Sequence, residues 1–250
     1  MSVPELPALC LPGYVDGIDV SRVQTITDPA AVYAAGFRFA FAKASEGTGY
    51  RDPAARRHLD ALSAAGLLVG AYGFARVSLG QPREQARLAY DAATSDGRHV
   101  VRMALDLESC PAGTPWAYLR DFAIEWVDEM RGFGSMPVLY TMASWLGPLG
   151  ATALEVPVWV AQYRSTTRAW APDAASVLPG VWDLWQYSGD GGPPGAGLPQ
   201  DCDRNLLRTD DLRGWFGLPS EPTYESDSSG VAHGTHVVDA ALEEYRRGED

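Results

Sequence analysis

The sequence predicts an α/β fold in which eight strands close an irregular barrel. Short runs rich in Val, Phe, Tyr and Trp alternate with helix-like segments across residues 14–217, which favours parallel strands joined by right-handed crossovers. Eight such runs in a chain of 250 residues fit a closed barrel. Beyond residue 163 the connections become rich in Gly and Pro, so we expect the later strands to lack full helices.

The predicted strands share a high content of β-branched and aromatic residues and are bounded by turn-forming residues. In chain order they are Tyr14–Ser21, Phe37–Glu46, Leu67–Ala75, Val101–Glu108, Met136–Met142, Val156–Tyr163, Val181–Ser188 and Cys202–Arg208.

Three segments between the early strands have helical spacing and helix-boundary residues. Asp52–Ala65 opens with Asp-Pro, which predicts an N-cap followed by proline at the first helical position, and it ends before Gly66. Gln81–Ser95 repeats small and apolar residues at helical spacing. Thr114–Arg131 begins with Thr-Pro and carries a continuous apolar face. Helices are therefore expected in all three segments.

The chain divides by composition into a barrel and short flanking segments. The predicted parts are an N-terminal extension (1–12), the barrel (13–217), a Pro/Ser/Gly-rich linker (218–234) and an amphipathic helix (235–250). A helix of about 12 residues is marginal alone in water. We therefore expect it to dock on the barrel or on a protein partner.

Charge and hydropathy exclude several function classes. Lys plus Arg is 20 and Asp plus Glu is 32, so the net charge is −12. This balance argues against nucleic-acid binding and against an anionic membrane surface. No run of about 18 apolar residues is present, so no membrane span is predicted. The N-terminus lacks the basic region of a secretory signal, so we expect another route of release.

Cysteine and histidine usage predicts neither a metal site nor a cofactor. The three cysteines are too few for a disulfide framework, so mostly reduced thiols are expected, with a Cys10–Cys202 bridge as the alternative. The four histidines are scattered and form no zinc-binding pattern. No histidine is placed to suggest a Ser or Cys nucleophile triad.

Four carboxylates fall at strand ends, where a parallel barrel places its reacting groups. Asp19 ends the first run, Asp106 and Glu108 end the fourth, and Asp203 opens the eighth. Asp106 and Glu108 are two residues apart, so on a strand they point to the same face, and repulsion raises one pKa. A protonated carboxyl group beside an ionised one is what glycoside cleavage needs. An isolated D-x-E at a strand end is also compatible with two solvated side chains.

Aromatic residues and one lysine favour a sugar-binding mouth. Aromatic faces stack on sugar rings while phenol and indole groups hydrogen-bond hydroxyls. We expect Lys43 to pair with Asp19 or Asp106, and Glu46 either to bind substrate or to lie solvated at the rim. About half of the aromatics are expected to serve packing instead. The candidate substrate-binding residues are Lys43, Tyr72, Phe74, Tyr140, Tyr163 and Trp185.

Seven motifs in order resemble the family 25 glycoside hydrolases, the lysozyme-type N-acetylmuramidases. The resemblance spans residues 17–205. The motifs are G-I-D-V-S at 17–21, F-A-K-A-S-E-G at 41–47, A-G-L-L-V-G-A-Y-G-F at 65–74, L-D-L-E at 105–108, W-V-A-Q-Y at 159–163, W-Q-Y-S at 185–188 and D-R-N at 203–205.

The resemblance implies a TIM-like (β/α)5(β)3 barrel that cleaves the β-1,4 bond between N-acetylmuramic acid and N-acetylglucosamine in peptidoglycan. By residue match, Glu108 is the general acid, and Asp106 orients the substrate N-acetyl group. Asp19 and Asp203 complete the acidic cluster. The family usually has histidine at position 73, where this chain has Gly73. Strand alternation puts this position on the face opposite Tyr72.

Action at the bacterial cell wall follows from this resemblance, with bacterial peptidoglycan as the partner. Because the N-terminus lacks the basic region of a secretory signal, we expect a phage lysin that is released at lysis or built into a virion. Two alternatives stay open. The first is a weakly active or inactive barrel that binds glycan within an assembly such as a phage tail. The second is another glycosidase such as a chitinase, although its D-x-x-D-x-D-x-E run is absent.

Overall fold

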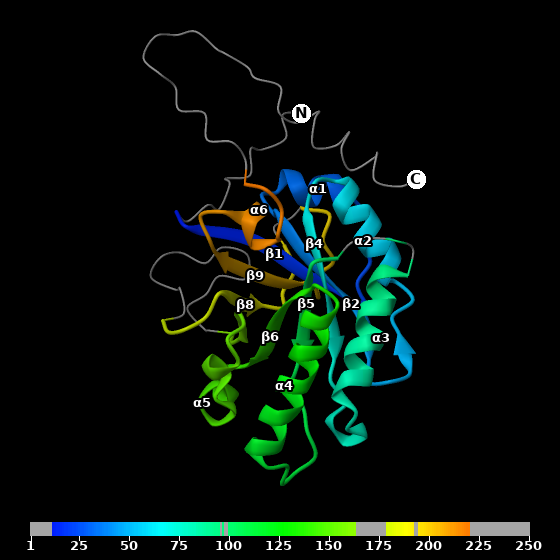
Figure 1. The fold of residues 1–250 in the computed structure, drawn as a ribbon. Coiled ribbons are helices and arrows are strands. Elements are labelled where there is room, and N and C mark those ends of the chain that lie inside the picture. The colour runs from blue at the N-terminus through cyan, green and yellow to red at the C-terminus, as the bar shows by residue number, and fades with distance from the viewer. Residues whose placement is uncertain (1–11, 96, 98–99, 164–178, 193–194, 221–250) are drawn as a thin grey trace, which may run out of the picture. The chain divides into compact units, whose positions relative to one another are not determined.

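The computed structural model describes residues 12–95, 97, 100–163, 179–192 and 195–220 (Figure 1). Its centre is a single sheet in which β1 pairs with both β9 and β2, and this double pairing closes an eight-stranded barrel. The strands are β1 (Tyr14–Val20), β2 (Phe39–Glu46), β3 (Tyr50–Arg51), β4 (Leu68–Phe74), β5 (Arg102–Asp106), β6 (Met136–Met142), β7 (Val158–Ala161), β8 (Leu184–Ser188) and β9 (Asp203–Arg208).

The predicted α/β barrel is confirmed, and each of the eight predicted strands has its counterpart. The additional strand β3 pairs only with β2, as a short hairpin arm outside the ring. Within the ring, β1, β2, β4, β5, β6, β7 and β8 pair in parallel with their neighbours in this order.

The last strand corrects the expectation of parallel pairing throughout. β9 runs antiparallel to both β8 and β1. Parallel strands need a long crossover, whereas antiparallel strands join through a direct loop. Residues 189–202 contain no helix in their described part, so the chain returns without crossing the barrel. As a result the first residue of β9, Asp203, lies at the carboxyl ends of the parallel strands.

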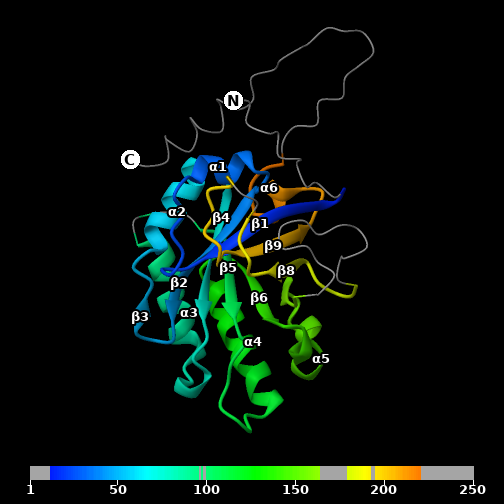
Figure 2. The same ribbon diagram turned by 180° about the vertical axis from the view of Figure 1, so that it is seen from behind.

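Helices cover mainly one side of the barrel. Figures 1 and 2 show α2, α3 and α4 beside one another along β2, β4 and β5. The helices are α1 (Pro29–Ala34), α2 (Ala55–Ala64), α3 (Pro82–Thr94), α4 (Trp116–Gly132), α5 (Leu146–Leu149) and α6 (Leu212–Trp215), with 3₁₀ turns η1 (Val77–Leu79), η2 (Ala143–Trp145) and η3 (Ala151–Leu154).

The three predicted helices exist, but two begin later than expected. Asp52 is not the N-cap of α2: its carboxylate accepts from the backbone N–H groups of Ala54 and Arg22, and so ties the helix start to the loop after β1. Thr114 donates to the Pro111 carbonyl, and Pro115 occupies the N-cap of α4. In both places the polar side chain stabilises the preceding loop instead of the first helical turn.

Helix α1 was missed because six residues are too few to show helical periodicity. Its Asp28-Pro29 start is the same signal that was noticed at residues 52–53. Here the Asp28 side chain does act as the cap, accepting from the Ala31 N–H at 3.0 Å.

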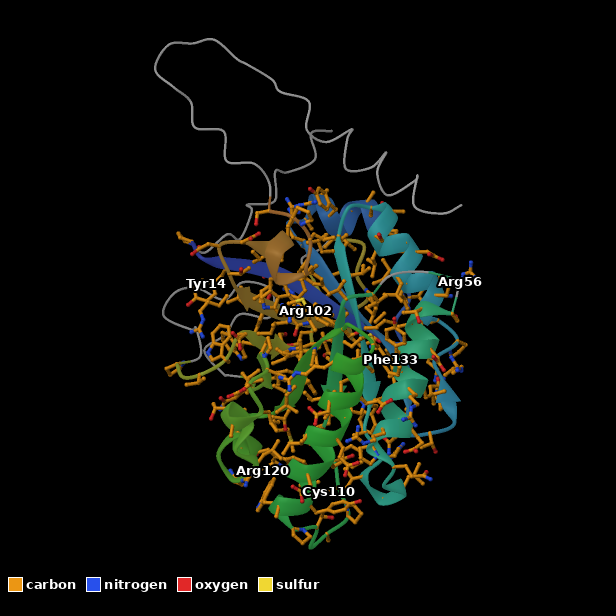
Figure 3. All side chains as sticks on the ribbon, in the orientation of Figure 1. Tyr14, Arg56, Arg102, Cys110, Arg120 and Phe133 are labelled. Atoms are coloured by element: carbon orange, nitrogen blue, oxygen red, sulfur yellow. The ribbon has the colours of Figure 1, made fainter. Side chains whose placement is uncertain are left out.

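Aromatic rings pack the barrel interior at the end where β2 and β5 begin. Phe39 and Phe41 of β2 meet Phe216, which follows α6, with ring centroids 6.2 Å and 6.1 Å apart. Arg102, labelled in Figure 3, starts β5 and places its guanidinium 4.0 Å from the Trp215 ring centroid. Since β2 and β5 begin at this end, α6 closes the end opposite their carboxyl termini.

The structure describes only part of the segments predicted to flank the barrel. Residues 218–220 fold back on α6, where the Leu218 N–H donates to the Arg213 carbonyl at 2.9 Å. The predicted segment 1–12 lies almost wholly outside the described residues, as do linker residues 221–234 and the helix at 235–250. In the described ranges no helix is long and apolar enough to cross a membrane.

Candidate active site

A cavity of about 210 Å³ lies at the carboxyl ends of the parallel strands. It contains all four predicted acidic residues and four of the six predicted substrate-binding residues. Its lining is Asp19, Ser21, Lys43, Tyr72, Phe74, Asp106, Glu108, Tyr140, Trp159, Gln186 and Asp203.

The first carboxyl pair is Asp106 and Glu108. Strand β5 ends at Asp106, two residues earlier than predicted, yet the Leu107 N–H still bonds the Tyr140 carbonyl at 3.0 Å. This bond continues the extended alternation, so Leu107 turns into the core and both carboxyl groups enter the cavity. Asp106 is 7% exposed, and its Oδ1 atom has no hydrogen-bond partner among the described residues.

Burial governs the protonation of this pair. It raises the pKa of Asp106 well above its usual range, and the neighbouring Glu108 raises it further. Burial also raises the pKa of Glu108, against the lowering effects of the Tyr140 hydroxyl and the Lys43 ammonium. The Tyr140 hydroxyl lies 3.4 Å from Glu108 Oε2. Both carboxyl groups are therefore biased toward the protonated form.

The second carboxyl pair is Asp19 and Asp203, which are direct partners in the β1–β9 ladder. Burial raises the pKa of Asp19 to about 6, although hydrogen bonds from Asn205 and Gln186 lower it. Burial and the charge of Asp19 raise the pKa of Asp203 to about 8. Two carboxyl groups in hydrogen-bond contact cannot both ionise freely, so one of them retains its proton near neutral pH.

Asn205 and Gln186 were not predicted as site residues. Both donate to Asp19 Oδ2, Asn205 at 2.8 Å and Gln186 at 2.9 Å. They lie in two of the motifs noticed in the sequence, and Asn205 is two residues from Asp203. Strand alternation alone would have placed Asn205 on the same face as Asp203.

The predicted partner of Lys43 was wrong. Its ammonium pairs with Glu46 at 2.6 Å, rather than with Asp19 or Asp106. Regular alternation places residues 43 and 46 on opposite faces, but a bulge between Lys43 and Ser45 shifts the register. The bulge brings the Glu46 carboxylate to the side of Lys43. Arg76 also pairs with Glu46 and lies outside the cavity lining.

Two of the predicted aromatic residues do not line the cavity. Trp185 is fully buried on the outer face of β8, where its indole N–H donates to the Gln162 carbonyl at 2.8 Å. Alternation turns the next residue, Gln186, inward in its place. Tyr163 is 57% exposed, and its hydroxyl lies 3.2 Å from both Gln186 Oε1 and Asp203 Oδ1. Trp159, which was not predicted, supplies an indole to the cavity wall.

The family assignment rests on a match over most of the barrel. The model of glycosyl hydrolases family 25 matches residues 18–196. The chain belongs to this family.

Relatives of known name agree with this family 25 assignment. Lysozyme M1 of Streptomyces globisporus is 32% identical over 205 residues, covering 76% of this chain and 67% of the relative. The N,O-diacetylmuramidase of a Chalaropsis species is 28% identical over 192 residues, covering 70% of this chain and 88% of the relative.

Solved structures show the same barrel. The bacterial lysozyme from Streptomyces coelicolor is 31% identical with a TM-score of 0.61, over 77% of this chain and 91% of that chain. The muramidase from Acremonium alcalophilum is 30% identical with a TM-score of 0.62, over 78% and 94% of the two chains. This protein is therefore a glycoside hydrolase. Glycoside hydrolases commonly react through paired carboxyl groups, and four carboxyl groups line its cavity.

Position 73 faces away from the cavity described above, as strand alternation predicts. A Cβ atom built on Gly73 would lie 2.9 Å from the Ala89 Cβ of α3 and 3.8 Å from the Trp126 ring. The helix layer therefore leaves no room for a larger residue here without rearrangement. The absent histidine concerns the packing behind β4 and not the cavity surface.

The described ranges contain no group of three or more His, Cys, Asp or Glu side chains suited to hold a metal ion. The Cys202 thiol is free and buried, whereas Cys10 lies outside the described residues. The polar groups that line the cavity are the four carboxyl groups, the phenols of Tyr72 and Tyr140, the Gln186 amide, the Lys43 ammonium, the Ser21 hydroxyl and the Trp159 indole.

Proposed function

We infer that this protein is an N-acetylmuramidase that cleaves the β-1,4 bond between N-acetylmuramic acid and N-acetylglucosamine in bacterial peptidoglycan. The observation that carries this proposal is the cavity itself, which is lined by two pairs of carboxyl groups together with aromatic side chains. The names of the relatives, a lysozyme and muramidases, support the same bond and the same polymer.

Glu108 is the general acid in this proposal. A general acid must hold a proton at working pH and release it to the leaving oxygen in the transition state. The raised pKa of Glu108 meets the first requirement. Its position in the cavity, beside the hydroxyl of Tyr140, meets the second.

Asp106 is the carboxyl group that orients the N-acetyl substituent of the sugar. Its Oδ1 atom is buried and without a hydrogen-bond partner in the described structure. Leaving such an atom unpaired costs free energy, and an incoming N–H donor would satisfy it. An acetamido N–H supplies that donor and would align its carbonyl oxygen to attack the anomeric carbon as the bond to the leaving oxygen breaks.

The remaining walls bind the sugar in this proposal. Phe74 and Trp159 contribute aromatic rings to the lining, while Tyr72 and Tyr140 contribute hydroxyl groups. Lys43 is the one cation among the described residues that line the cavity. It limits the repulsion among the carboxyl groups, since it lowers the pKa of both Asp106 and Glu108.

The test is a digest of purified peptidoglycan by the wild type and by Glu108→Gln, with fragments reduced by borohydride and identified by mass spectrometry. We expect the wild type to release fragments with a reduced muramic acid end, and the variant to release none. Reduced glucosamine ends, or cleavage of chitin without cleavage of peptidoglycan, would assign a different bond. Binding to several wall types without any release would favour the glycan-binding barrel.

The place of action follows from the substrate, which is the bacterial cell wall. A phage lysin or virion-associated origin remains a prediction from the sequence. It is tested by immunodetection of the protein in purified virions and in lysates of producing cells. A protein partner for residues 235–250 remains a prediction as well.

A further inference from the structure

The Asp19–Asp203 pair lies within a network of side-chain hydrogen bonds. Two side-chain amide groups converge on one oxygen of Asp19, with Asn205 Nδ2 at 2.8 Å and Gln186 Nε2 at 2.9 Å. An N–H donor requires an acceptor oxygen, and two donors on one oxygen favour the ionised carboxylate. Asp19 is thus stabilised as an anion despite its burial.

The orientation of the Asn205 amide is determined by its other neighbour. The Trp159 indole N–H lies 2.8 Å from Asn205 Oδ1. An indole can only donate, so the amide oxygen of Asn205 must face Trp159 and the NH₂ group must face Asp19. Trp159, Asn205 and Asp19 therefore form a chain of hydrogen bonds with a single allowed direction.

The orientation of the Gln186 amide is likewise determined by its neighbours. Its Oε1 atom lies 2.9 Å from the Tyr140 hydroxyl and 3.2 Å from the Tyr163 hydroxyl. Hydroxyl groups donate readily to an amide oxygen, and this leaves the Gln186 NH₂ group for Asp19. Both amide groups are 3% exposed or less, so water does not compete for their donors.

Asp203 has no comparable set of donors among the described residues. The Tyr163 hydroxyl lies 3.2 Å from Asp203 Oδ1 but at the same distance from Gln186 Oε1, and it has one proton to give. Asp203 also contacts Asp19, which lies directly across the ladder. When one proton is present, hydrogen bonding therefore favours Asp203 as its site.

We propose that Asn205 and Gln186 are positioning residues that keep Asp19 ionised and assign the proton shared by the two carboxyl groups to Asp203. This rests on the proposed function only in treating the cavity as the active site. A neutral Asp203 reduces the negative charge facing Glu108. It also leaves one fixed anion, Asp19, on the wall that the substrate approaches. The higher pKa of Asp203, about 8 against about 6 for Asp19, agrees with this assignment.

Other titratable groups surround the pair and act on both members. The Glu108 carboxylate raises the pKa of both Asp19 and Asp203. The groups that face the pair are Lys43, Tyr72, Asp106, Glu108, Tyr140, Tyr163 and Cys202. The amide groups differ from these because they contact Asp19 and not Asp203.

The experiment titrates ¹³C-labelled aspartate carboxyl groups by NMR in the full chain without substrate. In the wild type we expect a midpoint for Asp203 above that for Asp19, with resonances assigned from Asp203→Asn. Gln186→Met keeps the side-chain length and removes the donor. We expect it to raise the Asp19 midpoint and lower the Asp203 midpoint, each by about one pH unit. Asn205→Leu is expected to shift them in the same direction.

The matched control is Gln85→Met. Gln85 is 3% exposed and hydrogen-bonds the backbone of Arg76 and Gly80, away from the acidic pair. It should lower the stability without moving either midpoint. Equal shifts in the control, unchanged midpoints in a folded Gln186→Met protein, or an ionised Asp203 at pH 7 beside a protonated Asp19 would overturn the proposal. None of these readouts requires activity, so failure of the muramidase assignment would not affect them.

A second measurement keeps the proposal testable if Asn205→Leu does not fold. Asparagine mimics a neutral carboxylic acid, so Asp203→Asn should preserve the arrangement, whereas Asp19→Asn leaves two donors facing a neutral amide. At pH 7 we expect Asp203→Asn to unfold at the higher temperature of the two. The reverse order would contradict the assignment of the proton.

Discussion

The two acidic walls of the cavity differ in how well their carboxyl groups are satisfied. On the β5 wall, Asp106 has a buried oxygen without a partner in the described structure, and Glu108 has only a long contact to Tyr140. On the β1–β9 wall, Asp19 accepts two amide N–H groups and contacts Asp203. The first wall leaves hydrogen-bonding capacity unused, and the second uses most of it.

Under the proposed function, this difference separates the reacting groups from the supporting groups. An unsatisfied buried oxygen is costly in the free protein. In the proposed function the substrate pairs this oxygen, so binding free energy is directed to the β5 wall. A satisfied network is rigid and presents a constant charge to the substrate. The comparison predicts that substitutions on the β5 wall change the reaction, while substitutions on the β1–β9 wall change stability and its pH dependence.

The largest expected effect is on the β5 wall. Glu108→Gln removes the proton donor but keeps the shape, so we expect kcat on peptidoglycan to fall by about 10²–10⁴-fold with little change in unfolding temperature. Cleavage assays and thermal unfolding measure both quantities. Glu125→Gln, at an exposed site on α4, serves as the matched control and should retain wild-type kcat. A variant of Glu108 with unchanged kcat would remove the distinction between the walls.

The β1–β9 wall should contribute to the dependence of stability on pH, beside Asp106 and Glu108, whose pKa values are also raised by burial. The pKa values of Asp19 and Asp203 are raised in the folded protein to about 6 and about 8, from 3.8. Between pH 4 and pH 8 the folded state therefore binds more protons than the unfolded state, and the free energy of unfolding falls as pH rises.

Asp203→Asn should flatten this decline by up to about 1.4 kcal/mol per pH unit between pH 6 and pH 8. Urea unfolding at several pH values measures the slope. A slope equal to that of the wild type would show that Asp203 is not the group that retains a proton in the folded state.

Gly73 lies between the walls but faces the helix layer, so it tests packing alone. Gly73→Ala brings a Cβ to 2.9 Å from that of Ala89, and we expect a loss of about 1–3 kcal/mol in stability. Adding Ala89→Gly removes the atom in contact and should recover part of the loss. Cleavage per folded molecule should stay constant in both variants. An altered kcat with intact stability would place this position in the chemistry after all.

The smallest expected effect concerns the cation between the walls. Lys43 lowers the pKa of Glu108, so Lys43→Met should move the alkaline limb of kcat/KM upward by about one pH unit. The direction follows because the protonated acid is the active form. Arg76→Met is the control, since Arg76 pairs with the same Glu46 but does not line the cavity. A downward shift, or an equal shift in the control, would contradict this role.

Local patterns in the sequence were sufficient to predict where the strands lie and which acidic residues line the cavity. Asp19 and Asp106 follow apolar runs, and Glu108 lies two positions after Asp106. Because alternation has a period of two in any strand, the faces of these side chains follow from their spacing alone. The same rule identified the outward direction of position 73, and it would have separated inward Gln186 from outward Trp185.

Tertiary structure decided the features that depend on exceptions to alternation or on pairing between distant strands. The bulge between Lys43 and Ser45 redirects Glu46, and no composition signal marks it. The antiparallel return of β9 places Asp203 opposite Asp19, although the two are far apart in the chain. The sequence by itself determined which residues of a regular strand share a face, because that is a local property of the strand. Which of them meet was decided by closure of the barrel, because long-range pairing sets both the contacts and the burial that shift their pKa values.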